Sequence, residues 1–172
     1  MNKIFLATLL SLSTLLASEY QLDTEQSKVY YEAKKKQFFV TYTINGINRD
    51  ISGLIRTESD NYQGELSIDA SKFKTDSSMR DSNVAKDLNA KAHPNISFKY
   101  EIKSNKARGT MSVNGVSKVL EFPVTIRDEA QALFIDGNIT VQYKDFGIET
   151  PSNLILTAHD SLVIGAHLKF NK

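Results

Sequence analysis

The most regular feature of this chain is an alternation of apolar and polar residues that recurs in separate short segments. In residues 96–103, every second residue is apolar and its neighbours are Ser, Lys or Glu. A period of two is typical of a β-strand with one buried face, because successive side chains point to opposite sides. The pattern therefore predicts an all-β fold of eight or nine antiparallel strands. Further strands are expected at residues 29–33, 38–44, 47–57, 64–70, 109–113, 120–126, 134–143 and 162–170.

Gly, Asn and Pro residues predict where these strands turn or bend. The Asn-Gly pairs at residues 45–46 and 114–115 are strong hairpin signals, because both residue types tolerate a positive φ. Gly53 is expected to form a bulge or bend inside its strand. Pro123 cannot donate a ladder hydrogen bond, so its strand is expected to be interrupted or to lie near a sheet edge there.

Nearly every predicted strand has one apolar and one polar face. A single sheet that curls into a barrel buries all the apolar faces and leaves no sheet edge unpaired. We therefore expect an antiparallel barrel, and a sandwich of two sheets is the rival architecture. A barrel of eight strands is just wide enough to hold one slender ligand.

Residues 75–98 are the only long interruption of the alternation. Asp76 or Ser77 can cap a helix, and Val84 and Leu88 lie four residues apart on one helical face. We predict a short helix within residues 79–91 that rests on one end of the barrel. Long loops in compact β domains are commonly functional, so this segment is expected to shape the mouth of any cavity. Its Arg80-Asp81 pair is either a surface ion pair or a polar anchor at that mouth.

Aromatic and Met residues are frequent on the faces predicted to point inward. They either fill a solid core or line a hollow one, and composition alone favours the solid core. The residues concerned are Phe38, Tyr42, Phe98, Tyr100, Met111, Phe122, Tyr143 and Phe170.

The first 18 residues resemble a secretory signal peptide. Lys3 precedes a run of apolar residues that is shorter than the roughly 20 needed to span a bilayer, and small residues follow at a suitable cleavage site. We expect residues 19–172 to form one exported domain, located in a bacterial periplasm. Without Lys3 the chain has 20 basic and 20 acidic residues, and this balance argues against nucleic-acid binding. The chain contains no Cys, so disulfides and thiolate metal sites are excluded.

Few residues suggest catalysis or metal binding. The three His residues show no spacing typical of a metal site, and residues 159–161 contain the residue types of a serine-hydrolase triad without a Gly-x-Ser-x-Gly motif. We expect no enzymatic activity, with a hydrolase based on His93 or residues 159–161 as a minor alternative. Residues 34–36 are three consecutive Lys, which are expected to form a solvated turn or, as an alternative, to face anionic lipid.

Several motifs of this sequence, in this order, resemble the YceI family of bacterial, mostly periplasmic, lipocalin-like proteins. The similarity covers nearly all of residues 19–172, but residues 34–36 and 48–53 depart from the family pattern, of which only Gly53 is kept there. The matching motifs are Tyr20-x-Leu22-Asp23, Ser27-x-Val29, Thr75, Arg80-Asp81, Leu88, His93-Pro94-x-Ile96-x-Phe98, Gly109-Thr-Met-x-Val113-Asn-Gly115-Val116, Val119, Phe122-x-Val124 and Asp145-Phe146-Gly147-Ile148.

The resemblance implies an eight-stranded lipocalin-like barrel, capped at one end by a short helical insertion, with a long-chain lipid in its interior. An isoprenoid quinone, a polyprenyl lipid or a fatty-acid derivative is the implied ligand, and transient membrane contact and a homodimer are further expectations. The alternative is a stress-response or redox-partner interaction module with a solid barrel core. The residues expected to contact a lipid are Phe38, Tyr42, Arg80, Asp81, Phe98, Tyr100, Met111, Val113, Phe122, Tyr143 and Phe146.

Overall fold

The computed structural model describes residues 18–151 and 156–172 of the chain. The predicted signal peptide lies almost entirely outside these residues, so its presence and the domain boundary stay predictions. The strands are β1 (Ser18–Leu22), β2 (Lys28–Gln37), β3 (Val40–Asn48), β4 (Ile51–Glu58), β5 (Asn61–Asp69), β6 (Asn95–Lys103), β7 (Lys106–Val113), β8 (Val116–Asp128), β9 (Ala132–Gln142) and β10 (Leu156–Asn171). The helices are α1 (Ser78–Asp87) and the short 3-10 helix η1 (Tyr143–Phe146).

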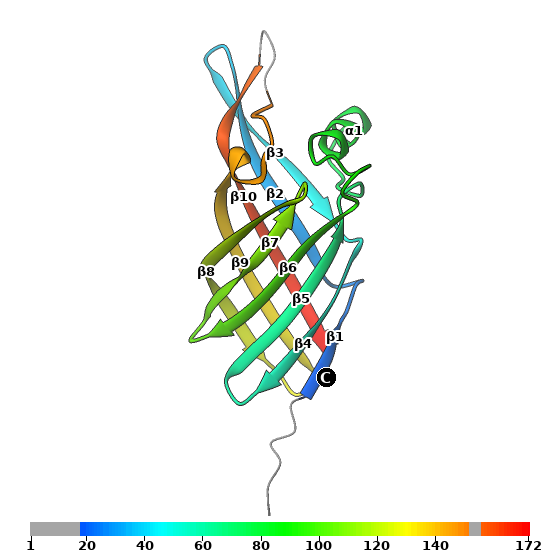
Figure 1. Ribbon diagram of the computed structural model, residues 1–172, viewed down its shortest axis with the longest axis vertical. Helices are drawn as coiled ribbons and strands as arrows, with labels where there is room; N and C mark the ends of the chain where they lie inside the picture. Colours follow the sequence, from blue (N-terminus) through cyan, green and yellow to red (C-terminus); the bar gives the residue numbers. More distant parts are fainter. Residues whose placement is uncertain (1–17, 152–155) are drawn as a thin grey trace, which may run out of the picture.

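Eight of the strands form a closed antiparallel ring in the order β1-β4-β5-β6-β7-β8-β9-β10 (Figure 1). The ring closes where β1 pairs with β10, at Gln21 opposite Asn171 and Leu22 opposite Phe170. This closure confirms the predicted eight-stranded barrel and excludes the two-sheet sandwich. It also leaves the apolar face of every ring strand directed inward.

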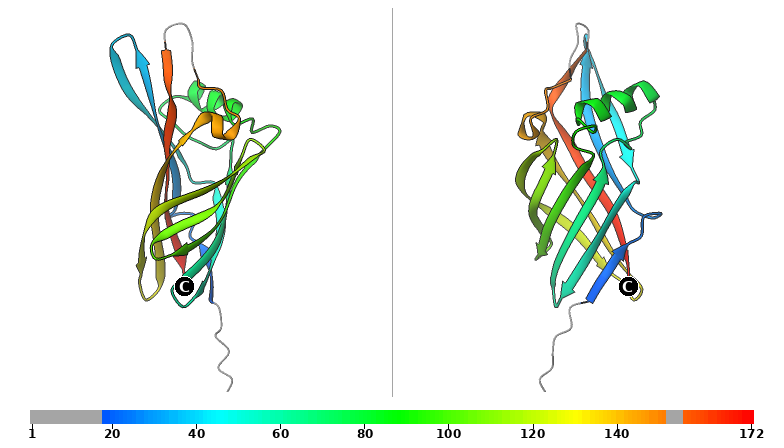
Figure 2. Two further views of the ribbon diagram at one scale, coloured as in Figure 1. Left: turned by 60° about the vertical axis from the view of Figure 1, so that its left-hand side comes forward. Right: turned by 45° about the vertical axis from the view of Figure 1, so that its right-hand side comes forward.

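The remaining two strands form a hairpin that extends the wall beyond the ring. β10 is long enough to pair with β1 near its C-terminal end and with β2 along the rest of its length. β2 and β3 then continue past the ends of the neighbouring strands and project from the end of the barrel on which α1 lies (Figures 1 and 2).

The predicted hairpin at residues 45–46 is wrong. Both residues lie inside β3, where Gly46 pairs with Tyr31 of β2. A side chain at this glycine would collide with the Tyr31 ring, since a Cβ would lie 2.1 Å from Tyr31 Cε1. The glycine is therefore required by the close approach of an aromatic ring. The β2–β3 turn is formed instead by residues 38–39, where Phe38 has a φ of 53°.

Of the other predicted turns and bends, some are confirmed and others are wrong. The hairpin at residues 114–115 is confirmed, with positive φ at both residues. Gly53 is not a bulge, because β4 and β5 pair through it without a register shift. β8 is continuous at Pro123, but its pairing changes there from β7 to β9, so the prediction of an edge position is right. Residues 34–36 lie within β2, and the expected lysine-rich turn is therefore wrong.

Helix α1 lies across one end of the barrel, as predicted, but is shorter than expected (Figure 2). It begins after Ser77 and ends at Asp87, whereas the prediction extended to residue 91. The reason is Asn89, whose left-handed φ of 50° terminates the helix before Pro94 can do so. Within the described residues, no helix is long and apolar enough to cross a membrane.

Candidate functional site

The barrel encloses a cavity of about 1080 Å³ that lies toward the α1 end. Ligand pockets for small molecules typically measure about 300–1,000 Å³, so this cavity is large for a domain of this size. Its wall is predominantly apolar and is supplied by the inward faces of most ring strands. The wall includes Leu66, Ile68, Ile96, Phe98, Ile102, Met111, Val113, Phe122, Ile135, Ile139, Val141, Leu162, Ile164 and Leu168.

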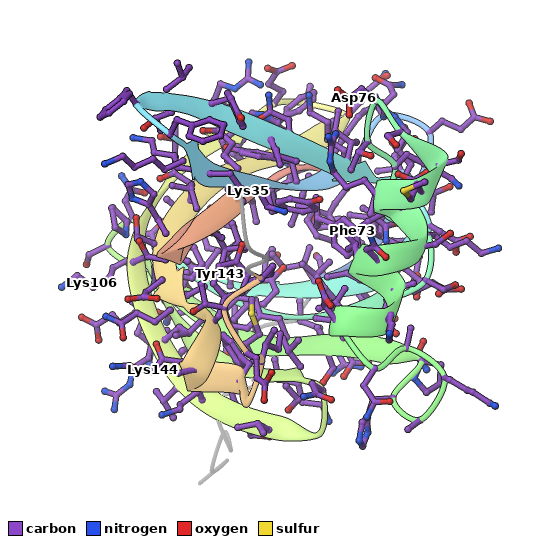
Figure 3. The ribbon with its side chains drawn as sticks, turned by 90° about the horizontal axis from the view of Figure 1, so that it is seen from above. Lys35, Phe73, Asp76, Lys106, Tyr143 and Lys144 are labelled. Carbon is purple, nitrogen blue, oxygen red and sulfur yellow. The ribbon has the colours of Figure 1, made fainter. Side chains whose placement is uncertain are left out.

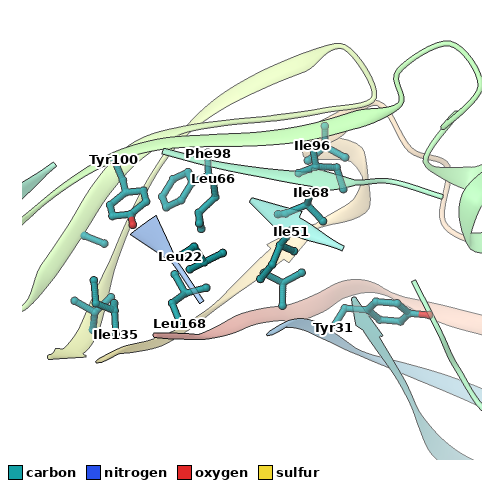
Figure 4. Packing of buried hydrophobic residues seen from close by; sticks show 14 of the residues in the cluster. Leu22, Tyr31, Ile51, Leu66, Ile68, Ile96, Phe98, Tyr100, Ile135 and Leu168 are labelled. Atoms are coloured by element: carbon teal, nitrogen blue, oxygen red, sulfur yellow. The ribbon is translucent and has the colours of Figure 1, made fainter. Parts of the chain in front are cut away.

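The opposite end of the barrel is solid. Ile55, Leu133 and Phe170 are fully buried there and do not line the cavity. Phe170 pairs with Leu133 on β9 and with Leu22 on β1, so it lies where the ring closes. The buried side chains of the interior form one continuous apolar cluster between this base and the wall (Figure 4). The interior is thus part core and part cavity, a combination that neither sequence alternative described.

Nine of the eleven predicted lipid contacts line the cavity, and Phe38 and Asp81 do not. Phe38 is 75% exposed at the tip of the β2–β3 hairpin, so its expected interior position is wrong. The alternation was extended into a residue that belongs to the turn. The nine residues in the wall or at the mouth are Tyr42, Arg80, Phe98, Tyr100, Met111, Val113, Phe122, Tyr143 and Phe146. Contact between these residues and a lipid stays a prediction.

Asp81 holds the segment before α1 in place. Its carboxylate accepts hydrogen bonds from the Thr75 backbone N–H at 2.7 Å and the Thr75 hydroxyl at 2.8 Å, and it lies 3.4 Å from Lys74 Nζ. These contacts, led by the Thr75 hydroxyl, lower the pKa of Asp81. Arg80 points to the mouth and pairs with Asp76. Asp81 therefore supports the mouth from outside, and Arg80 forms part of its rim.

The mouth of the cavity carries polar groups from three separate elements. Seen from above, Lys35 of β2, Tyr143 of η1 and Phe73 surround the opening (Figure 3). Tyr31, also from β2, packs against Phe73 with ring centroids 5.7 Å apart. Asp87 completes this group from α1. We call Tyr31, Lys35, Asp87 and Tyr143 the mouth cluster.

Burial raises the pKa of Tyr31, Asp87 and Tyr143 in the mouth cluster. It raises the pKa of Tyr31 to about 12, and the nearby Tyr143 and Asp87 add to the shift. Burial, with Asp87 close by, also raises the pKa of Tyr143. Both phenols therefore stay protonated at neutral pH and present O–H donors at the rim. Burial raises the pKa of the Asp87 carboxyl as well, against the opposing charges of Lys35 and Lys86.

The ionised form of Asp87 is expected to cost stability. A folded-state pKa above the unfolded value means that stability is lost as pH rises through the folded pKa. We therefore expect Asp87→Asn to be more stable than the wild type at neutral pH, with the difference vanishing below about pH 3, where the carboxyl is protonated in both states. Urea unfolding followed at several pH values measures this. A difference that stays constant with pH would contradict the assignment.

Tyr100 places a hydroxyl deep in the barrel. Its ring stacks on Phe98 with centroids 5.1 Å apart, and among the described residues its buried Oη has no hydrogen-bond partner. Burial alone raises the pKa of this phenol. An unpaired buried hydroxyl destabilises the fold, so removing it favours the folded state.

We expect Tyr100→Phe to raise the free energy of unfolding of the ligand-free protein by about 1 kcal/mol. Tyr62→Phe is the matched control, because Tyr62 is only half-buried and its hydroxyl is not among the buried groups without a hydrogen-bond partner. Its substitution should change stability little. Thermal unfolding of delipidated protein measures both, and a clear loss of stability in Tyr100→Phe would refute the reading of an unpaired hydroxyl.

The side chains that suggested a hydrolase are not arranged as a catalytic triad. His159 and Asp160 are exposed in an irregularity of β10, and the Asp160 carboxylate accepts a hydrogen bond from Thr150 at 3.0 Å. His93 packs over Gly115 instead, where a Cβ would lie 2.7 Å from the imidazole. Within the described residues, no three acidic or His side chains converge as metal ligands. The cavity is therefore the strongest candidate site.

The mouth cluster contains residues that sequence reasoning missed as site residues. Tyr31 and Lys35 are alternate residues of β2 and lie on the same inward face as Val29 and Ala33. The alternation therefore contained a signal for both. Asp87 gave no such signal, because its position depends on where α1 lies on the barrel. Val84 of α1 and Leu88, the residue after the helix, line the cavity, in agreement with their predicted packing against the barrel end.

A closed eight-stranded barrel with one large apolar cavity, open at one end, defines the class of lipocalin-like ligand-binding barrels. The chain belongs to the YceI family: the YceI-like domain matches residues 20–170. This is a family of barrels that bind hydrophobic ligands in the interior. The match confirms the family resemblance derived from the sequence motifs.

Solved structures agree with this fold. BcnA from Burkholderia cenocepacia superposes with a TM-score of 0.71 at 23% identity, over 86% of this chain and 98% of that one. Mutants of the CJ YceI protein, one of them with a monobromobimane guest, give a TM-score of 0.62 at 17% identity, over 100% of this chain and 93% of theirs. No protein with a curated description matches this sequence.

Proposed function

We propose that this protein is a periplasmic carrier that holds one long-chain amphiphilic lipid, of isoprenoid or related type, inside its barrel. The observation that carries the proposal is the cavity of about 1080 Å³, with an apolar wall and polar groups gathered at its open end. Burying a hydrocarbon chain contributes about 0.8 kcal/mol per methylene, so a wall of this kind suits a long tail. The solid base ends the cavity and therefore limits how far the tail extends into the barrel.

In this proposal, the head group of the ligand lies at the mouth cluster. Tyr31 and Tyr143 offer O–H donors, and Lys35 offers a cation beside the Asp87 carboxylate. This arrangement suits a polar head group that accepts hydrogen bonds, such as a quinone carbonyl, a carboxylate or a phosphate oxygen. Non-covalent binding suffices, and the proposal includes no chemical step.

Transient membrane contact belongs to the proposal, because a long-chain lipid is reached most readily at a bilayer surface. A homodimer stays an expectation from the family resemblance. The alternative interaction module required a solid barrel core, and the cavity argues against that core.

Lipid extraction and mass spectrometry of protein purified from its own periplasm tests the proposal. We expect one amphiphile per barrel, bearing an isoprenoid or other long chain. Repeated absence of any stoichiometric amphiphile, together with no binding of quinone, polyprenyl or fatty-acid probes by delipidated protein, would refute the lipid-carrier function.

A further inference from the structure

The tip of the β2–β3 hairpin exposes apolar side chains to a degree unusual for a turn. Phe38 is 75% exposed, Phe39 99% and Val40 60%. These three consecutive apolar side chains at the end of a projecting hairpin therefore gain little burial on folding. Such clusters commonly mark a surface that contacts a membrane or a protein.

Turn chemistry gives an independent reason to look for a role outside the fold. A two-residue hairpin turn favours Asn, Asp or Gly, and an aromatic residue at positive φ is strained. The Asn114-Gly115 turn of this barrel follows the rule, with positive φ at both residues. The β2–β3 turn does not, since Phe38 has a φ of 53°. Folding alone therefore does not explain the two Phe residues.

The hairpin is also locally basic. Residues 33–48 contain three Lys and no acidic residue, although residues 19–172 as a whole are neutral. The side chains of Lys34 and Lys36 are exposed, whereas Lys35 lines the cavity. Exposed Lys next to aromatic residues at a tip is the combination that suits the interface of an anionic bilayer.

We infer that the β2–β3 tip docks this protein onto anionic lipid bilayers, with Phe38 and Phe39 inserted at the interface and Lys34 and Lys36 at the phosphate level. The hairpin projects from the same end of the barrel as α1 (Figures 1 and 2). The cavity mouth lies at this end too, because Met79 and Val84 of α1 line the cavity. Docking therefore brings the mouth to the bilayer, and a lipid reaches the cavity with little exposure of its tail to water. The inference rests on the proposed carrier function only for this last step.

Vesicle co-sedimentation of delipidated full-length domain tests the docking without any cavity ligand. Wild-type protein is expected to bind vesicles of phosphatidylcholine with phosphatidylglycerol, to bind pure phosphatidylcholine weakly, and to be released at high salt. Phe38→Asn/Phe39→Gly should lose binding at least about tenfold through the lost apolar insertion. Because Asn-Gly suits this turn, the variant should unfold at the same temperature as wild type or higher.

Lys34→Gln/Lys36→Gln tests the basic part of the same surface. At roughly fivefold per Lys, the pair should weaken binding to the anionic vesicles about 25-fold. Lys103→Gln/Lys106→Gln, at the turn between β6 and β7, is the charge-matched control and should bind as wild type does.

Three results would overturn the inference. One is wild-type protein that does not bind anionic vesicles, and another is a folded tip variant that binds them undiminished. The third is a dimer of wild-type protein in sedimentation that the tip variant abolishes, without vesicle binding, because the tip would then contact a second copy. Since no cavity ligand is involved, a failed docking test leaves the carrier function standing, and a failed lipid extraction leaves the docking standing.

Discussion

Replacing Met111 by Glu is expected to weaken binding of a fluorescent long-chain fatty-acid probe about 100-fold. Met111 lies on β7 opposite Phe98 of β6, and both side chains face the cavity. A carboxylate in this apolar wall must stay hydrated or become protonated, so it displaces several methylenes of a bound tail at about 0.8 kcal/mol each. Fluorescence titration of delipidated protein measures the affinity.

Two further variants separate loss of the site from loss of the fold. Met111→Trp fills the same space without a charge and should lower affinity in the same direction. Val119→Glu adds the same charge at a position 65% exposed on β8 and should bind the probe normally. If Met111→Glu keeps the wild-type circular dichroism spectrum and binds with wild-type affinity, the probe does not occupy the cavity.

The second large effect concerns the solid base of the barrel. We expect Phe170→Ala to lower the free energy of unfolding by about 3–5 kcal/mol, because it leaves a void in a fully packed region. At roughly 2–4 °C per kcal/mol for a domain of this size, the melting temperature should fall by roughly 6–20 °C. Such a loss is a large fraction of the total stability of an ordinary domain.

Phe122→Ala is the comparison that makes this prediction specific. Phe122 lines the cavity and is only half-buried, although its ring lies 6.0 Å from that of Phe98. One side of its ring already lacks packing partners, so its removal should cost about 1–2 kcal/mol in ligand-free protein. Equal losses for Phe170→Ala and Phe122→Ala would contradict the division into a solid base and a hollow upper part.

The fold was largely predictable because every ring strand buries only one face. That arrangement places an apolar residue at every second position of the sequence. The sheet closes into a barrel because all the apolar faces must be buried together. One error arose because a residue that is distant in the sequence determines the role of a glycine. Gly46 was read as a turn residue, yet its role is to accommodate the Tyr31 ring on the adjacent strand.

The site was predictable only in part. Parity along the strands identified wall residues such as Phe98, Met111 and Phe122, since they share the inward face. Whether that interior is hollow depends on the side-chain volume across the whole ring, which no local pattern contains. The mouth cluster joins β2, α1 and η1, so Asp87 could not be connected to Tyr143 before the helix was placed on the barrel.

The most direct test of the central claim is a crystal structure of the protein purified from its own periplasm. We predict continuous tubular density inside the barrel, running from the mouth near Lys35 and Tyr143 toward Tyr100, with its polar end at the mouth. A cavity that is collapsed or holds only water, in protein never exposed to detergent or organic solvent, would contradict the account.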